Sequence, residues 1–382
     1  MIWREVISRF RRYQTKLNIY PNRACAILIK FLVKLFSKSL RGLGQRPKVL
    51  VLTSHYLPPT KGDVTMAAFI TNITQAIGDT PLLRLDMIKN HIGYEGHIYA
   101  KLEYLNPSFS KKDRIALGMI NMAECKGLLK PGQPILEMSS GNTGTGVAMV
   151  GSAKGYRVIC VLSKGNSPER ARMIEAFGGE VVLVDQAPDA VKGKVSSEDI
   201  RLVEVEAERL VAETGAFFLN QFKNFDNARA QEPAAHEMWA QSQGKIQAFA
   251  DFIGTGGTFT GYSQVFKSLN PKMLCYAVEP YGCAYYKGEI IQGTYHQIQG
   301  GGYSKAMDIV DKGLIDGCIT VTDEEAEQMT RLLAQKEGIF AGFSSGANLM
   351  AAVKQLQGVD AGKHFGIVIN DCGLKYMSTC LF

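Results

Sequence analysis

From Met66 onward, short runs of β-branched residues alternate with helix-length amphipathic segments. Strands that alternate with helices in this way are typical of an α/β fold with a parallel sheet, because a crossover helix joins each strand to the next parallel one. We therefore expect the body of the chain to be α/β. Strands are predicted at 134–137, 157–162, 180–185, 248–253, 275–279 and 366–370, and helices at 142–154, 168–177, 203–214 and 262–268.

The composition is that of a globular protein. With 46% hydrophobic and 21% charged residues, the 382-residue chain suits one large two-lobed domain or two mid-sized ones. Its 39 glycines cluster in loops, which suits a protein that handles phosphate. Residues 186–199 lack periodicity and are expected to form a loop.

The basic charge of the chain is concentrated in its first 65 residues. These contain 13 Lys and Arg but only two acidic residues, whereas the remainder contains 30 Lys and Arg and 34 Asp and Glu. A nucleic-acid-binding protein usually carries its basic excess on the folded body. We therefore expect no nucleic-acid partner.

The first 65 residues allow three interpretations. Their apolar stretch, 24–36, contains Lys30 and Lys34 and is shorter than the roughly 20 apolar residues of a membrane-spanning helix. One interpretation is an Arg-rich mitochondrial targeting segment, and another is a basic amphipathic helix on a membrane surface. In the third, the segment is not part of the functional protein, which begins at Met66.

None of the eight cysteines has a metal-binding or redox spacing, since no pair forms a CxxC motif. Free thiols are typical of a reducing compartment, so we expect a cytoplasmic protein, or a mitochondrial one if the first 65 residues are a targeting segment. No structural metal is expected. The cysteines are Cys25, Cys125, Cys160, Cys275, Cys283, Cys318, Cys372 and Cys380.

A glycine-rich loop, 254–258 (GTGGT), follows the strand predicted at 248–253 and precedes a helix. Glycines allow backbone N–H groups to converge on an anion, and the N-terminus of a helix adds positive potential there. The loop lacks the lysine of a Walker motif and the spacing of a dinucleotide-binding fingerprint. Both a phosphate site and an ordinary tight turn account for it.

Lys112 stands at the expected start of a helix, within the segment 110–114 (SKKDR). The helix dipole disfavours a cation at this end, and a lysine whose pKa is lowered is a better imine-forming nucleophile. An ordinary exposed turn is the alternative interpretation.

Two further segments place small hydroxyl or amide side chains at the expected start of a helix. The segment 139–144 (SSGNTG) follows a predicted strand and offers a site for a carboxylate, and the segment 342–346 (GFSSG) precedes a helix from Ala347. Plain N-capping is the alternative interpretation for both.

The order and spacing of these four segments resemble those of the cysteine synthase and cystathionine β-synthase family of fold-type II pyridoxal-phosphate enzymes. The resemblance extends from about Thr71 to Thr379. It implies a two-lobed, parallel-sheet fold similar to tryptophan synthase β, within a catalytic body at 66–382. The larger lobe is implied to comprise 66–112 and 221–382, and the smaller, mobile lobe about 113–220. A homodimer and a serine acetyltransferase partner are also implied.

The family's motifs imply roles for individual residues. Lys112 attaches covalently to pyridoxal 5′-phosphate and later handles the α-proton of the substrate, whereas Lys111 stands where the family usually has an apolar residue. Ser344 faces the pyridine nitrogen of the cofactor. The other implied positions are Gly254, Thr255, Gly256, Gly257 and Thr258 at the cofactor phosphate, Asn142 at the 3′-oxygen, and Ser139, Ser140, Thr143 and Gln221 at the substrate carboxylate.

The implied reaction is β-replacement on an activated serine, with O-acetylserine and sulfide giving L-cysteine. A neutral hydroxyl at Ser344 does not hold the pyridine nitrogen protonated, which favours β-elimination over transamination. The alternatives are a lyase that resembles cystathionine β-synthase or desulfurates cysteine, and a pyridoxal-phosphate-binding scaffold without turnover. The segment 300–303 (GGGY) is similar to the cystathionine β-synthase branch in its tyrosine.

Overall fold

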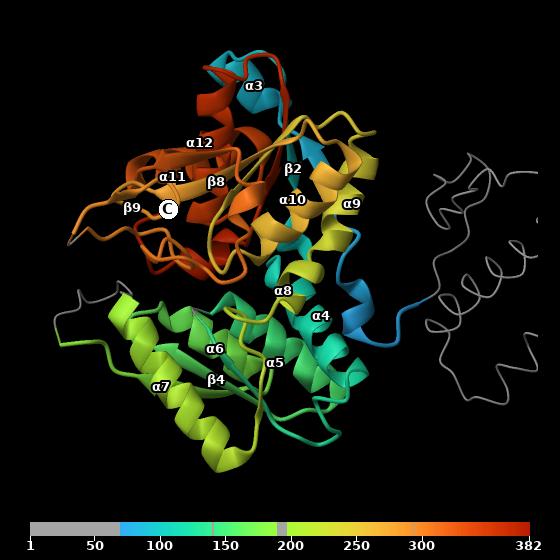
Figure 1. Cartoon of the computed structure of the whole chain (residues 1–382), viewed down its shortest axis with the longest axis vertical. Helices are drawn as coiled ribbons and strands as arrows, with labels where there is room; N and C mark the ends of the chain where they lie inside the picture. The colour runs from blue at the N-terminus through green and yellow to red at the C-terminus, as the bar shows by residue number, and fades with distance from the viewer. Residues whose placement is uncertain (1–68, 140, 189–196, 293) are drawn as a thin grey trace, which may run out of the picture. The chain divides into compact units, whose positions relative to one another are not determined.

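The computed structural model describes residues 69–139, 141–188, 197–292 and 294–382. Within these residues the fold has two main sheets, each covered by helices, and Figure 1 shows the two halves coloured mainly orange to red and green. The three interpretations of residues 1–65 lie outside the described residues. The α/β architecture with parallel strands confirms the expected fold class.

The larger sheet has six strands, and each strand is parallel to its neighbours except at one edge, where β1 is antiparallel to β2. Strand β12, which comes late in the chain, pairs with β2 on one side and β7 on the other. In order across the sheet the strands are β1 (Leu82–Arg84), β2 (His97–Lys101), β12 (His364–Val368), β7 (Ala248–Phe252), β8 (Leu274–Pro280) and β11 (Gly317–Val321).

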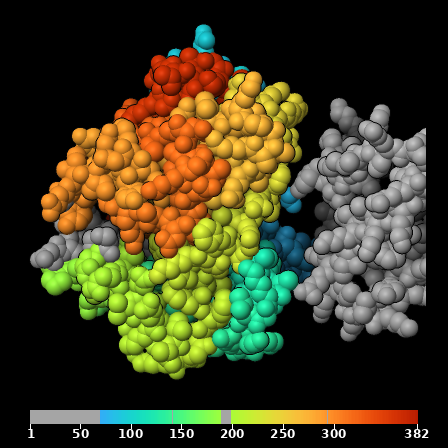
Figure 2. All heavy atoms as spheres, in the orientation of Figure 1, coloured from blue at the N-terminus to red at the C-terminus, as the bar shows by residue number. Residues whose placement is uncertain are grey.

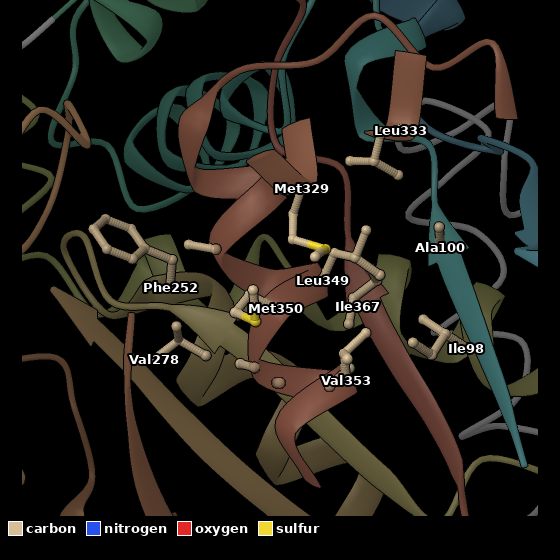
Figure 3. Packing of buried hydrophobic residues seen from close by; sticks show 14 of the residues in the cluster. Ile98, Ala100, Phe252, Val278, Met329, Leu333, Leu349, Met350, Val353 and Ile367 are labelled. Carbon is tan, nitrogen blue, oxygen red and sulfur yellow. The ribbon is translucent and has the colours of Figure 1, made fainter. Parts of the chain in front are cut away.

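Helices cover both faces of this sheet because successive residues of each strand point to opposite sides. In β7, Ala250 and Phe252 belong to one core and Phe249 to the other. Figure 3 shows the first core, where Met350 and Val353 of α12 and their neighbours pack against strand residues. Its helices are α3 (Asp86–Ile92), α11 (Asp323–Glu337) and α12 (Phe343–Leu356), and those of the second core are α9 (Glu232–Gln241) and α10 (Gly257–Leu269).

The smaller sheet has four parallel strands, and β4 at its interior is buried along its whole length. Helices again cover both faces. The strands, in order, are β5 (Glu180–Val184), β4 (Val158–Ser163), β3 (Ile135–Met138) and β6 (Phe217–Phe218). One face packs against α4 (Lys112–Cys125), α5 (Asn142–Lys154) and α6 (Pro168–Ala176), and the other against α7 (Ser197–Thr214).

Short elements complete the described chain. The two-stranded ribbon of β9 and β10 follows β8, and α8 precedes α9.

Figure 2 shows that the green segments occupy the lower part of the surface and the orange and red segments the upper part. Among the residues described, no helix is both long and apolar enough to cross a membrane. The bounds are η1 (Ile73–Ala76), η2 (Glu103–Leu105), α8 (Asp226–Arg229), β9 (Cys283–Ala284), β10 (Glu289–Ile290), η3 (Lys312–Leu314) and η4 (Gly373–Tyr376).

Local sequence signals explain where several helices begin and end. Thr322 and Glu325 form a capping box at the start of α11, and Gly338, with φ of +69°, ends this helix in the left-handed conformation. Pro168 occupies the first turn of α6, where its missing N–H costs no hydrogen bond.

The six expected strands all form, with bounds that differ by one or two residues at most. The prediction of a loop over residues 186–199 is wrong at its C-terminal end, because α7 already begins at Ser197. Asp199, inside that helix, accepts a hydrogen bond from the backbone N–H of Ala187 at 2.7 Å and so holds the incoming segment. Residues 189–196 of that loop lie outside the described residues. The antiparallel β1 was not expected, because three residues are too few to show a period.

Candidate active site

A cavity lies where the smaller sheet's helices α4 and α5 begin, opposite the ends of β7 and β12. It brings together nine of the twelve predicted site residues. Ser139 lines an adjoining cavity, Thr143 is buried beside Gln221, and Ser140 lies outside the described residues. The nine are Lys112, Asn142, Gln221, Gly254, Thr255, Gly256, Gly257, Thr258 and Ser344.

The glycine-rich loop joins the end of β7 to the start of α10. Gly256 has φ of +88°, a conformation that favours glycine. A Cβ atom on Gly257 would lie 2.0 Å from the side-chain oxygen of Asn227, and one on Gly254 would lie 2.6 Å from the carbonyl oxygen of Gly300. Glycine is therefore required for this close packing, and the start of α10 presents backbone N–H groups that suit a phosphate.

Lys112 is the first residue of α4, and its ammonium nitrogen lies 3.3 Å from the side-chain oxygen of Gln221. Burial, together with the positive charge of Lys111, lowers the pKa of Lys112 to about 7. At neutral pH a substantial fraction of this amine is unprotonated, as an amine that attacks an aldehyde must be.

Lys111 has a different partner, the carboxylate of Asp251 on β7. Its ammonium nitrogen lies 3.1 Å and 3.3 Å from the two carboxylate oxygens, and both residues are buried in the wall of the cavity. The amide nitrogen of Asn348 lies 3.3 Å from the same carboxylate. Lys111 is thus neutralised by an ion pair, while Lys112 faces an amide.

The side chains predicted to hold a carboxylate also bond to one another. The oxygen of Ser139 accepts backbone N–H bonds from Gly141 and Gly144, both at 2.9 Å, so it stabilises the turn before α5. Thr143 donates to the side-chain oxygen of Gln221 at 2.5 Å. The alternative of plain N-capping by Asn142 is wrong, since Gly141 is the N-cap of α5 and Asn142 is the first residue of the helix; Ser140, the other residue of that alternative, lies outside the described residues. The hydroxyl proton of Ser139 is not used by its two bonds.

Asn142 is held on both sides of its amide. Its nitrogen donates to Asp371 at 2.8 Å, and its oxygen accepts from Lys375 at 2.8 Å. Burial lowers the pKa of Lys375 to about 8, and its nitrogen also donates to the backbone oxygen of Ser108 at 3.0 Å. These bonds fix the orientation of Asn142 at the edge of the cavity.

Several lining residues were missed from the sequence. Asp251 could have been noticed as the one charged residue in the apolar run 248–253. Asn370, which lines the cavity, carries no such signal, nor does Lys375, which does not line it but bonds to Asn142; each becomes part of the site only through contacts with distant segments. Phe222 was also missed. Its ring centroid lies 5.9 Å from that of Tyr303, the tyrosine singled out above in the segment 300–303, and both side chains line the cavity.

The adjoining cavity has a volume of about 260 Å³. It shares Phe222, Gln299, Gly300 and Tyr303 with the first cavity. Ser139 and His296 are among its other lining residues. The two spaces meet at these shared side chains, so a molecule in the larger space lies next to the site of Lys112.

The residues of the first cavity fit pyridoxal phosphate. A glycine loop at a helix start suits its phosphate, the amine of Lys112 suits its aldehyde, and the hydroxyl of Ser344 suits its ring nitrogen. Within the described residues, no group of three or more His, Cys, Asp or Glu side chains is arranged to hold a metal ion.

Comparisons with known proteins agree with this fit. The family model described as pyridoxal-phosphate dependent enzyme matches residues 73–371. A cysteine synthase of Staphylococcus aureus is 37% identical over 315 residues, which cover 82% of this chain and 97% of that protein. A cystathionine beta-synthase of Apis mellifera is 35% identical over 328 residues, covering 85% of this chain and 63% of that protein.

Solved structures show the same relationship. The O-acetyl serine sulfhydrylase isoform 3 of Entamoeba histolytica superposes with a TM-score of 0.76 at 32% identity, covering 85% of this chain and 95% of that one. The fold, the cavity and these relatives therefore agree, and the chain belongs to the family of pyridoxal-phosphate-dependent enzymes that includes cysteine synthase and cystathionine β-synthase.

Proposed function

We propose that this enzyme replaces the acetate of O-acetylserine by sulfide and so forms L-cysteine. The observation that carries the proposal is the position of Lys112, whose amine shares one cavity with the glycine loop and with Ser344. The cysteine synthase of Staphylococcus aureus supports the reaction, since it aligns with 82% of the chain.

Pyridoxal phosphate, when bound, supplies an aldehyde that links to amines and a ring that withdraws electrons from the α-carbon of the substrate. The backbone N–H groups of Gly256 and Gly257 and the hydroxyls of Thr255 and Thr258 would hold its phosphate. Lys112 would make the covalent attachment. The amine of Lys112, when free, would also accept the α-proton of the substrate, and its pKa, lowered by burial, suits this role.

The remaining polar residues would orient the amino acid. The amide of Gln221 lines the cavity, and the hydroxyl of Thr143 lies buried beside it. Ser139 lines the adjoining cavity. These three side chains would bind the carboxylate. Asn142 would bind the cofactor's 3′-oxygen. Since Ser344 has no negative charge to keep the ring nitrogen protonated, loss of the β-substituent would be favoured over transamination.

Product analysis tests this proposal. Purified enzyme is supplied with O-acetylserine and sulfide, and L-cysteine is measured by mass spectrometry. A protein that forms no cysteine from this pair, while it converts serine and homocysteine, would have a different function.

A second candidate function is the formation of cystathionine from serine and homocysteine. The observation in its favour is the adjoining cavity of about 260 Å³, which offers more room than sulfide needs. Tyr303 lies between the two cavities. Competition between sulfide and homocysteine for one enzyme preparation distinguishes the two candidates.

Further proposals concern the organisation of the protein. We propose that residues 66–382 form the catalytic body and that the lobe at about 113–220 moves during turnover. We also propose that the enzyme is a homodimer, that it is cytoplasmic, and that it binds serine acetyltransferase. The support is the family resemblance and the free thiols of buried residues such as Cys160 and Cys275. Sedimentation with and without a serine acetyltransferase tests the two assemblies.

A further inference from the structure

Asn370 connects the start of α4, the start of α12 and the end of β12. Its backbone N–H donates to the hydroxyl of Ser345 at 2.9 Å, and its carbonyl oxygen accepts from the N–H of Lys111 at 2.9 Å. Its side-chain nitrogen donates to the hydroxyl of Ser344 at 3.0 Å. Asn370 is only 5% exposed and lines the cavity, so this residue fixes Ser344 relative to the lysine segment.

The hydrogen bond to Ser344 has a direction. A serine hydroxyl has one proton to donate and two positions at which it accepts. The side-chain nitrogen of Asn370 can only donate, so it occupies an accepting position of Ser344 and cannot receive the serine proton. That proton is then available to an acceptor in the cavity.

This arrangement is unfavourable for the other polar atom of the Asn370 side chain. The amide oxygen of Asn370 is buried and, among the residues that the structure describes, has no hydrogen-bond partner. An unsatisfied buried acceptor is unfavourable, and its presence in a native protein calls for an explanation. The need for an N–H group next to Ser344 supplies one.

We propose that Asn370 is a positioning residue that makes the Ser344 hydroxyl a hydrogen-bond donor to the pyridine nitrogen. The inference rests on the proposed position of that nitrogen at Ser344. When Ser344 donates this hydrogen bond, the ring nitrogen is hydrogen-bonded but receives no proton from a charged partner. The strength with which the ring withdraws electrons depends on this state of the nitrogen. Asn370 thus acts on reaction specificity through Ser344 without touching the substrate.

The experiment uses protein loaded with pyridoxal phosphate that carries ¹⁵N in its ring, and the ¹⁵N chemical shift is measured without substrate. Asn370→Asp keeps the shape but replaces the donor by an acceptor, which draws the serine proton away from the ring. The ¹⁵N chemical shift of this variant is expected to change in the same direction as that of Ser344→Ala, and by most of the same amount. Asn370→Leu, which neither donates nor accepts, is expected to give a smaller shift in the same direction and serves if a buried carboxylate impairs folding.

The double variant tests whether Asn370 acts through Ser344. In the Ser344→Ala background, Asn370→Asp is expected to leave the ¹⁵N shift unchanged. Ser345→Ala is the matched control, since it removes a 2.9 Å hydrogen bond to Asn370 but leaves the Ser344 contact, and it is expected to lower the melting temperature without moving the ¹⁵N signal.

Three results would overturn the inference. They are an unchanged ¹⁵N signal in Asn370→Asp, equal shifts from Asn370→Asp with and without Ser344, and a shift in Ser345→Ala as large as that in Asn370→Asp. None of these readouts requires turnover, so an enzyme that fails to make cysteine would still report on Asn370. If Ser344→Ala itself leaves the signal unchanged, the proposed position of the ring nitrogen is wrong, and with it this inference.

Discussion

The ammonium nitrogen of Lys111 lies 3.1 Å from a carboxylate oxygen of Asp251, buried in the wall of the cavity that Lys112 also lines. The two lysines are consecutive in the sequence, yet among the described residues only Lys111 forms an ion pair with a carboxylate, whereas Lys112 contacts an amide. The carboxylate of Asp251 thus lies against the amine of Lys111. Lys112, next to the amide of Gln221, is left as the reactive one.

The first prediction concerns which lysine binds the cofactor. Borohydride reduction of the yellow, cofactor-loaded enzyme, followed by peptide mass spectrometry, is expected to find pyridoxal phosphate on Lys112. Lys112→Ala should lose the covalent adduct, and Lys111→Ala should retain it, because the Lys111 amine is engaged by the carboxylate of Asp251. A cofactor adduct on Lys111 would show that the assignment of Lys112 is wrong, and with it the roles assigned to the other residues of the site.

The second prediction is a pH dependence. Only the neutral amine of Lys112 attacks an aldehyde, and the pKa of Lys112 is about 7. The rate at which apo-protein binds pyridoxal phosphate covalently should therefore rise with pH, with a midpoint near 7, and level off above pH 8.

Two variants move this midpoint in opposite directions. The positive charge of Lys111 lowers the pKa of Lys112 and the negative charge of Asp251 raises it. Lys111→Met should thus shift the midpoint to higher pH and Asp251→Asn to lower pH. Midpoints that move together, or that do not move, would show that the ion pair has no electrostatic effect on Lys112.

The third prediction concerns stability. Arg114 binds Glu103 and Glu237 through four hydrogen bonds of 2.7–2.9 Å, and Glu103 is fully buried. Arg114→Leu should lower the free energy of unfolding by about 3–5 kcal/mol, because it leaves a buried carboxylate without its counter-ion. Urea denaturation followed by circular dichroism measures the change.

Arg157→Leu is the control for this variant. It removes an arginine that forms a comparable pair with Glu180, but both side chains are about half exposed. Its urea midpoint should remain close to that of the unmodified enzyme. Equal losses in the two variants would mean that burial of the pair is not what matters.

The fourth prediction concerns the amino-acid site. Gln221→Ala should weaken binding of O-acetylserine by about 1–3 kcal/mol, the usual effect when a buried polar group loses its partner, and should leave the cofactor bound. Titration of the cofactor's absorbance with the amino acid measures the affinity. Gln241→Ala, which changes an amide bonded to Thr80 outside the cavity, should leave this affinity unchanged.

The fifth prediction concerns the basic N-terminal segment. A protein that starts at Met66 should fold, bind cofactor and turn over at the rate of the full chain, since all the described residues that line the cavity lie at Lys111 or later. Loss of solubility or activity in this shortened protein alone would contradict the interpretation in which residues 1–65 are dispensable.

The sequence predicted best what depends on neighbouring residues. The helix expected at 142–154 forms with those bounds, because its glycine-rich start and the αL glycine at Gly155 are local signals. The glycine-rich turn was likewise recognisable from a strand, a glycine cluster and a helix in succession, although α10 begins at Gly257 and not at residue 262 as expected. Period and turn chemistry suffice for such elements.

What the sequence could not predict depends on contacts between distant segments. Asn370 belongs to the site because β12, which precedes it, pairs with β2 and β7, and these strands are about 120 residues or more away in the chain. Asp251 and Lys111 are separated by 140 residues. The resemblance to a family supplied the roles of Lys112 and Ser344, but not those of residues outside its motifs.

The position of β12 at the interior of the six-stranded sheet has a consequence for biosynthesis. A chain leaving the ribosome N-terminus first presents β2 and β7 long before the strand that joins them, so both edges stay open to pairing with other chains until residue 368 has emerged. Nascent chains and products of premature termination before β12 would therefore expose the same aggregation-prone edges. For this enzyme, protection by chaperones would therefore matter throughout the interval between the emergence of β7 and that of β12.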